Sequence, residues 1–178
     1  AAGLAVRVEL IGTDGITVLS SADGADGETV LLQNVAIDAE GTYTVRVSSL
    51  AGWGIYEVQA VLNAQLESES WTASDNSVRA NAEAIDDSSV ALLDAADRLA
   101  VLGRVSAGGN DWYSFTLSAG QSVSLVASRT DGGDASNLTL RLYDSAGNKQ
   151  ANGAIDAGNV DQNIVNFIAP AAGTYYAR

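Results

Sequence analysis

The sequence predicts an all-β protein built as an antiparallel β-sandwich of jelly-roll type. Three observations carry this prediction. Apolar and polar residues alternate with a period of two, the segments that alternate are short, and turns rich in Gly, Asn and Asp separate them. The pattern is clearest from residue 110 to residue 178, where no segment has the periodicity of a helix.

Five strands are expected in this C-terminal part, at residues 110–117, 122–128, 138–144, 163–168 and 174–178. In the first of them, alternation sends Tyr113, Phe115 and Leu117 to one face of the strand. We expect that face to lie against the core. Trp112 then points outward together with Ser114.

An internal repeat decides how the rest of the chain is organised. Residues 4–47 resemble residues 138–178. Leu4–Val8 aligns with Leu138–Leu142, and Gly41–Tyr43 aligns with Gly173–Tyr175 once a two-residue gap is placed in a loop. The chain therefore spans one and a third units of a tandem array whose period is about 130 residues.

The repeat predicts three parts. Residues 1–64 form the C-terminal half of one β-sandwich repeat, which ends in a strand at 54–62. Residues 65–77 form an acidic linker. Residues 78–178 form a nearly complete second repeat that lacks the equivalent last strand.

The start of the second repeat is less regular. A short helical turn is expected at 79–85, and a helix or an irregular segment continues to about Asp97. A strand is expected from Leu99 to Val105.

Composition argues against an enzyme. The 178 residues include no Cys, His or Met, which excludes a Cys/His zinc site, a disulfide framework, a thiolate nucleophile and a histidine base. Twenty-two acidic residues against nine basic ones give a formal charge of −13, which disfavours nucleic acid as a partner. No apolar run approaches the roughly 18 residues of a membrane span, so membrane insertion is not expected.

Four motifs in order suggest a family. They are Asp111–Phe115, Ala119–Gln121, Leu140–Gly147 and Ala169–Tyr176. Together they resemble the bacterial pre-peptidase C-terminal (PPC) domain. The resemblance implies a non-catalytic β-sandwich accessory module, found at the ends of secreted peptidases and in tandem in large surface proteins. It also implies that the protein is bacterial and is secreted or displayed on the cell surface.

The same resemblance implies a calcium site. Some relatives hold calcium where an N-terminal Glu-x-Glu-x-Asn linker meets aspartates near the first strand. Here Glu67 and Glu69 match the two glutamates, and Trp71 stands where an asparagine would follow. Calcium takes six to eight oxygen ligands, more than two glutamates provide. Asp75 and Asp111 would supply the remaining carboxylates. The alternative is a solvated acidic linker.

Two functional hypotheses follow. In the first, the chain is an extracellular repeat module with a structural or adhesive role, stiffened by calcium. Neighbouring repeats or identical chains would be its partners, joined by strand complementation as a polymer or a swapped dimer. In the second, the chain is an accessory domain that binds polysaccharide or fibrous protein for a secreted peptidase or other hydrolase. Trp112 is then the candidate ligand-binding residue, although it could equally pack against a neighbouring unit or the linker.

Overall fold

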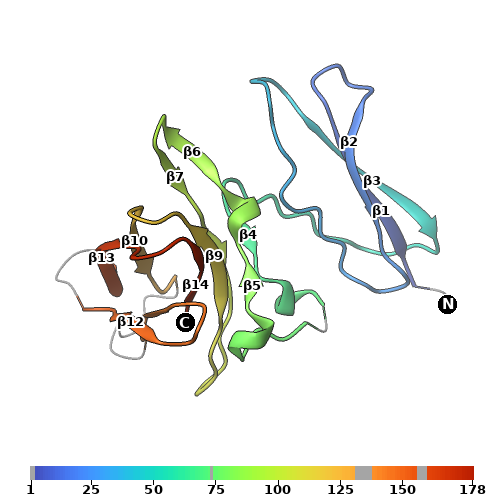
Figure 1. The fold of residues 1–178 in the computed structure, drawn as a ribbon. Coiled ribbons are helices and arrows are strands. Elements are labelled where there is room, and N and C mark those ends of the chain that lie inside the picture. The colour runs from blue at the N-terminus through green and yellow to red at the C-terminus, as the bar shows by residue number, and fades with distance from the viewer. Residues whose placement is uncertain (1–2, 73, 131–137, 156–159) are drawn as a thin grey trace. The chain divides into compact units, whose positions relative to one another are not determined.

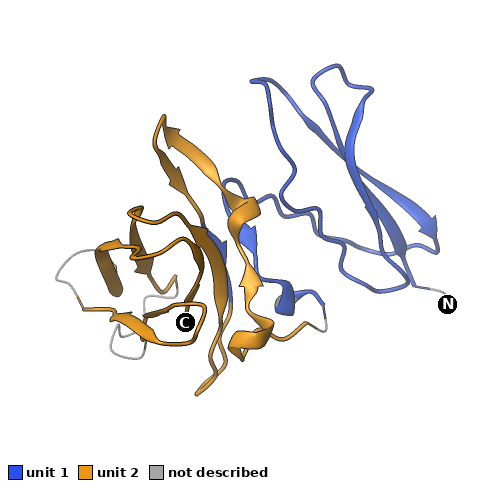
Figure 2. Ribbon diagram, in the orientation of Figure 1, with its two compact units in different colours: residues 1–73, 100–103 blue, residues 74–99, 104–178 orange. Residues whose placement is uncertain are grey.

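A computed structural model describes residues 3–72, 74–130, 138–155 and 160–178. The described part is nearly all β, as the sequence predicts. The chain divides into two units, shown in Figure 2. Unit 1 comprises Ala1–Ala73 and Ala100–Gly103, and unit 2 comprises Ser74–Leu99 and Arg104–Arg178.

Unit 1 is organised around an antiparallel sheet with the strand order β2-β1-β3 (Figure 1). Its strands are β1 (Ala5–Ile11), β2 (Val18–Asp23) and β3 (Thr44–Ala51). A parallel pair of short strands, β4 (Gln65–Leu66) and β8 (Val101–Leu102), and the 3₁₀ turn η1 (Ser68–Ser70) complete the unit.

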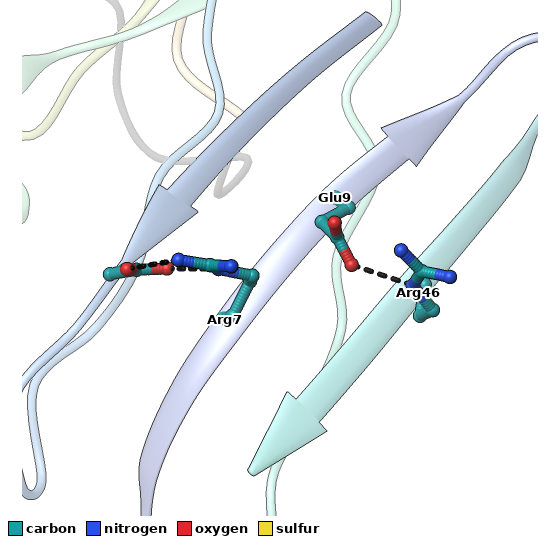
Figure 3. A network of polar contacts seen from close by, with 4 residues as sticks. Arg7, Glu9 and Arg46 are labelled. Carbon is teal, nitrogen blue, oxygen red and sulfur yellow. Dashed lines mark hydrogen bonds and ion pairs between the residues drawn. The ribbon is translucent and has the colours of Figure 1, made fainter. Parts of the chain in front are cut away.

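Ion pairs tie the central strand of unit 1 to both of its neighbours (Figure 3). The Nε atom of Arg7 on β1 lies 2.6 Å from Asp23 on β2. Two residues further along the same face, Glu9 lies 2.6 Å from the Nε of Arg46 on β3. The hydrogen bond from Arg46 lowers the pKa of Glu9. Opposite charges on facing residues thus support the register that the backbone pairing sets.

Two sheets make up most of unit 2. A five-stranded sheet has the order β12-β11-β14-β9-β5, and a two-stranded sheet pairs β10 with β13. The strand bounds are β5 Glu83–Ala84, β9 Tyr113–Leu117, β10 Ser122–Ala127, β11 Arg141–Tyr143, β12 Lys149–Asn152, β13 Gln162–Ile168 and β14 Gly173–Ala177. The hairpin β6 (Val90–Leu93) and β7 (Ala96–Arg98) and the 3₁₀ turns η2 (Arg79–Asn81) and η3 (Asp86–Ser88) precede β9.

The core of unit 2 lies between these two sheets. Phe115 and Leu117 of β9 are buried, as their alternation predicts. Leu142 of β11 and Tyr175 of β14 are also buried. The ring of Tyr175 meets that of Phe167 on β13 edge-on, with the centroids 5.9 Å apart. Aromatic contact between the two sheets gives unit 2 the character of a β-sandwich.

The three-stranded arrangement of unit 1 recurs in unit 2. The order β2-β1-β3 corresponds to β12-β11-β14, with antiparallel pairing throughout. Leu10 faces Val45 in unit 1, and Leu142 faces Ala177 in unit 2, so both partners recur at the spacing that relates Gly41 to Gly173. The two hairpins even share a register shift at the same place, after Leu10 and after Leu142.

Local backbone features recur at the same spacing. Gly15 and Gly147 have positive φ in the hairpin turns, where glycine avoids the strain of a Cβ. Asn34 and Asn166 share the left-handed conformation, with φ of 56° and 54°. Both pairs lie at the spacing of 132 residues that relates Gly41 to Gly173.

A tyrosine corner recurs as well. The Tyr43 hydroxyl donates to the Ala39 carbonyl at 2.6 Å, and the Tyr175 hydroxyl donates to the Ala171 carbonyl at 2.9 Å. Each bond closes the turn that leads into the last strand of its sheet. Donor and acceptor are four positions apart in both units, so the corner is the same structural feature twice.

Several sequence predictions need correction. The alignment of Leu4–Val8 with Leu138–Leu142 is wrong, because strand pairing makes Leu10, and not Val8, the equivalent of Leu142. A slip of two residues keeps the same side chains on the same face, so alternation could not detect it. The strand expected at 54–62 is also wrong. Those residues form no strand and nearly all are exposed, since no neighbouring strand pairs with them.

The N-terminal part of unit 2 differs in a similar way. The helix or irregular segment expected up to Asp97 is instead the 3₁₀ turn η3 followed by the antiparallel hairpin β6–β7. The strand expected from Leu99 to Val105 is reduced to β8. Strand β8 is held by β4, a partner distant in sequence, which local periodicity cannot reveal.

The buried tyrosine corner gives a direct test of this fold. Tyr175→Phe removes one hydrogen bond from a residue that is 3 % exposed. We therefore expect the free energy of local unfolding of β14 to fall by about 1 kcal/mol. Amide hydrogen exchange of β14 measures the change. Tyr176→Phe is the matched control. Equal losses in the two variants would contradict the assigned role of the Tyr175 hydroxyl.

Candidate binding face of unit 2

Trp112 lies directly before β9 and is half-buried on the face opposite to the core. Its ring packs against that of Tyr143 on β11, with 5.0 Å between the centroids at an interplanar angle of 43°. The Arg178 guanidinium lies 5.7 Å from the centre of the same ring. Trp112 therefore faces away from the core, as the alternation predicts, and is anchored by neighbours in its own unit.

Cross-strand pairing explains why these side chains gather. Tyr143 faces Tyr176, and Arg141 exchanges both backbone hydrogen bonds with Arg178. Facing residues of antiparallel strands project to the same side of a sheet. Leu142, between Arg141 and Tyr143, points the other way and is completely buried.

Two arginines fix the edges of this surface. Arg178 donates from Nε and Nη2 to the Asn110 Oδ1 atom at 2.9 and 2.5 Å. Arg79, from η2, donates from Nη1 to the Ser145 carbonyl at 2.7 Å and lies 5.3 Å from the centre of the Tyr176 ring. Guanidinium groups held against aromatic rings are oriented and only partly hydrated, which suits recognition of other molecules.

We call this set the aromatic–arginine face. Its members are Trp112, Tyr143, Tyr176, Arg79, Arg141 and Arg178. All six are partly exposed. Three of the nine basic residues of an acidic chain are therefore concentrated on one sheet face. Planar rings and guanidinium donors together can stack on sugar rings and bind carboxylates or carbonyl oxygens.

The arginines also alter the acidity of the central tyrosine. Burial raises the pKa of Tyr143, but the hydrogen bonds that its hydroxyl receives from Arg178 and Arg141 outweigh this effect. The pKa of Tyr143 consequently lies below its usual value. The two guanidinium groups thus act on the same hydroxyl.

The four predicted calcium ligands are divided between the units. Glu67 follows β4 of unit 1 and is completely buried, and Glu69 lies in η1. Asp75 and Asp111 belong to unit 2. The Asp75 carboxylate accepts a hydrogen bond from the Ser77 amide at 2.8 Å, which lowers the pKa of Asp75.

Oxygen donors of this type suit calcium chemically. Within the ranges that the structure describes, however, no three acidic side chains form a group that could hold a metal ion. Calcium binding stays a prediction from the sequence. The same holds for Trp112 as a ligand-binding residue.

Sequence reasoning singled out Trp112 but missed the rest of the aromatic–arginine face. The signal was present, because Arg141 and Tyr143 are two residues apart, as are Tyr176 and Arg178. That spacing places each pair on one face of a strand. Knowing that the two strands are neighbours was the missing information.

Comparison with known families supports one of the sequence predictions. Residues 109–178 match the family model of the bacterial pre-peptidase C-terminal domain. This non-catalytic domain is often found in peptidases. The match covers β9 to β14, and so includes most of the aromatic–arginine face. No curated protein and no solved structure matches the chain. Among the described residues, no helix is long and apolar enough to cross a membrane.

The acidity of Tyr143 tests the electrostatics of this face. Arg178→Gln removes a donor that lowers the pKa of Tyr143 and leaves the burial that raises it, so that pKa should rise. An NMR titration of the tyrosine ring carbons measures the change. Arg7→Gln, in unit 1, is the matched control and should leave Tyr143 unaffected. A constant or lower pKa of Tyr143 in Arg178→Gln would contradict the assignment.

Proposed function

We propose that this chain is a non-catalytic extracellular β-sandwich repeat module with a structural or adhesive role in a tandem array. The recurrence of one strand arrangement in both units is the observation that carries the proposal. Two copies of a turn, a bulge position and a tyrosine corner in identical order support descent from one repeating unit.

A location outside the bacterial cell, secreted or on its surface, is part of the proposal. It rests on the match to the pre-peptidase C-terminal domain over residues 109–178. The high negative charge favours a soluble, strongly hydrated surface. No residue with the chemistry of a thiolate nucleophile or a histidine base is present in the sequence, which also favours a non-catalytic role.

The aromatic–arginine face favours a second candidate function. In this alternative, the chain is an accessory domain that binds polysaccharide or fibrous protein on behalf of a secreted peptidase or other hydrolase. Trp112 would provide a stacking surface, and Arg79 and Arg178 would donate hydrogen bonds to the polymer. Partly exposed rings flanked by oriented guanidinium groups are the support for this reading.

Retention on insoluble polymers separates the two functions. We expect the chain to stay in the supernatant with collagen, chitin and cellulose, since a spacer has no need to bind them. If the chain is retained, and Trp112→Ala and Arg79→Gln both abolish retention, the accessory function replaces the structural one. Trp53→Ala, which changes an 83 % exposed tryptophan of unit 1, is the matched control. Turnover of a peptide or glycoside substrate would contradict both.

Calcium stiffening is a further part of the proposal, supported by the Glu67-Ser68-Glu69 sequence and the oxygen-rich donor set. A ligand that binds only the folded state stabilises it, so calcium should raise the melting temperature and a chelator should reverse the rise. Differential scanning calorimetry measures both. Glu69→Gln should reduce the calcium-dependent shift, and Glu57→Gln, at an exposed position, should not. An unchanged melting temperature would remove calcium from the proposal.

A further inference from the structure

In unit 2, two strands cover the elements that recur in unit 1. Strand β9 pairs with β14 from Leu117 opposite Gly173 to Tyr113 opposite Ala177. Strand β10 pairs with β13. Between them, the turn at Gly120 and Gln121 exchanges two backbone hydrogen bonds with Ala169, at 2.8 and 2.9 Å. Strand β9 belongs to the five-stranded sheet and β10 to the two-stranded sheet, so this β9–β10 arch pairs with a strand in each of them.

Unit 1 contains the elements that such an arch would cover. Strand β3 is the equivalent of β14, and among the described residues β1 is its one strand neighbour. Its outer edge is the position that β9 takes in unit 2. Residues 30–36 are the equivalent of β13, and they form no strand.

Burial differs sharply between the equivalent positions. Ala169 is completely buried under the β9–β10 turn, whereas its equivalent Ile37 is 52 % exposed. Val45, on β3, is 46 % exposed. Isoleucine and valine are this exposed beside an edge of β3 that has no strand neighbour in the described part of the chain, so covering them would lower the free energy.

One further backbone feature is shared by the acceptor segment of unit 1 and its equivalent in unit 2. In unit 2, Asn166 sits at a bulge of β13 with positive φ, and its amide donates to the Ser124 Oγ atom of β10 at 3.1 Å. Asn34 has the same conformation in a segment that forms no strand. A non-glycine residue with positive φ is uncommon, so its recurrence marks an equivalent backbone position. In unit 1 the Asn34 side chain donates to the Gln65 Oε1 atom of β4 at 3.4 Å.

We propose that the outer edge of β3 and residues 30–37 of unit 1 form an acceptor for a β-arch, two strands joined by a turn that enter different sheets, with the amino-acid pattern of residues 112–127. By equivalence with unit 2, a residue corresponding to Phe115 faces Tyr43, and one corresponding to Tyr113 faces Val45. The turn of the arch lies over Ile37. This inference rests on the proposed function, because it assigns the partner surface of a repeat module.

The chemistry of the arch suits this acceptor. Residues 112–127 contain no charged side chain, so the arch avoids repulsion from a protein whose formal charge is −13. Phe115, Leu117, Val123 and Leu125 provide the alternating apolar face. Added strands bind through main-chain hydrogen bonds, and their alternate side chains give specificity.

A synthetic peptide of residues 110–128, labelled with a fluorophore, tests the proposal on the full chain. We expect saturable binding at one peptide per chain by fluorescence anisotropy. Hydrogen exchange should show new protection at 30–37 and on β3. Ile37→Asp should weaken binding at least about tenfold, because it places a carboxylate under the turn of the arch. Ile55→Asp, at a fully exposed position outside the acceptor, should bind like the parent chain.

Four outcomes would overturn the acceptor. They are no binding, equal binding of a scrambled peptide, equal loss in Ile37→Asp and Ile55→Asp, and protection confined to unit 2. The last result would mean that the peptide replaces the chain's own β9–β10 arch. The polymer retention experiment uses no peptide, so failure of the acceptor and failure of the proposed function are observed separately.

Discussion

The pairing of β9 with β14 is the interaction on which the rest of unit 2 depends. A strand edge carries unpaired N–H and C=O groups, and burying them without partners costs more free energy than a hydrogen bond usually contributes. Strand β9 meets this requirement for β14, and β10 meets it for β13. The side chains of Phe115, Leu117 and Tyr175 are buried because these pairings bring the two sheets together.

The same pairing builds the surface opposite to the core. Fixing β9 beside β14 brings Trp112 to the end of a sheet that already presents Tyr143 and Arg178. Alternation guarantees that a strand with a buried Phe115 turns Trp112 and Ser114 outward. Core and candidate binding face are therefore two sides of one register, and a shift of one residue in β9 would disrupt both.

Periodicity recovered most of the fold of unit 2 from the sequence. Strands β9, β10, β13 and β14 lie where alternation predicts them, since each has an apolar face that identifies it. Prediction failed at 54–62, where a pattern that resembles a strand has no strand beside it. It also missed most of the aromatic–arginine face, whose members converge through pairing between β11 and β14. A single sequence shows which residues can form a strand, but the neighbour of that strand is a non-local property.

The two units together separate these local and non-local requirements. The hairpin register, the turn at Gly15 and the Tyr43 corner each depend on residues close in sequence. All of them form in unit 1, where the outer edge of β3 has no strand beside it among the described residues. Burial does not follow, because equivalents of the buried Ala169 and Tyr175 are exposed or only half-buried there. Unit 1 therefore keeps the local turns of a sandwich, with isoleucine and valine at the positions that a β9–β10 arch would cover. Covering these side chains with a strand from another polypeptide segment would lower the free energy of the pair.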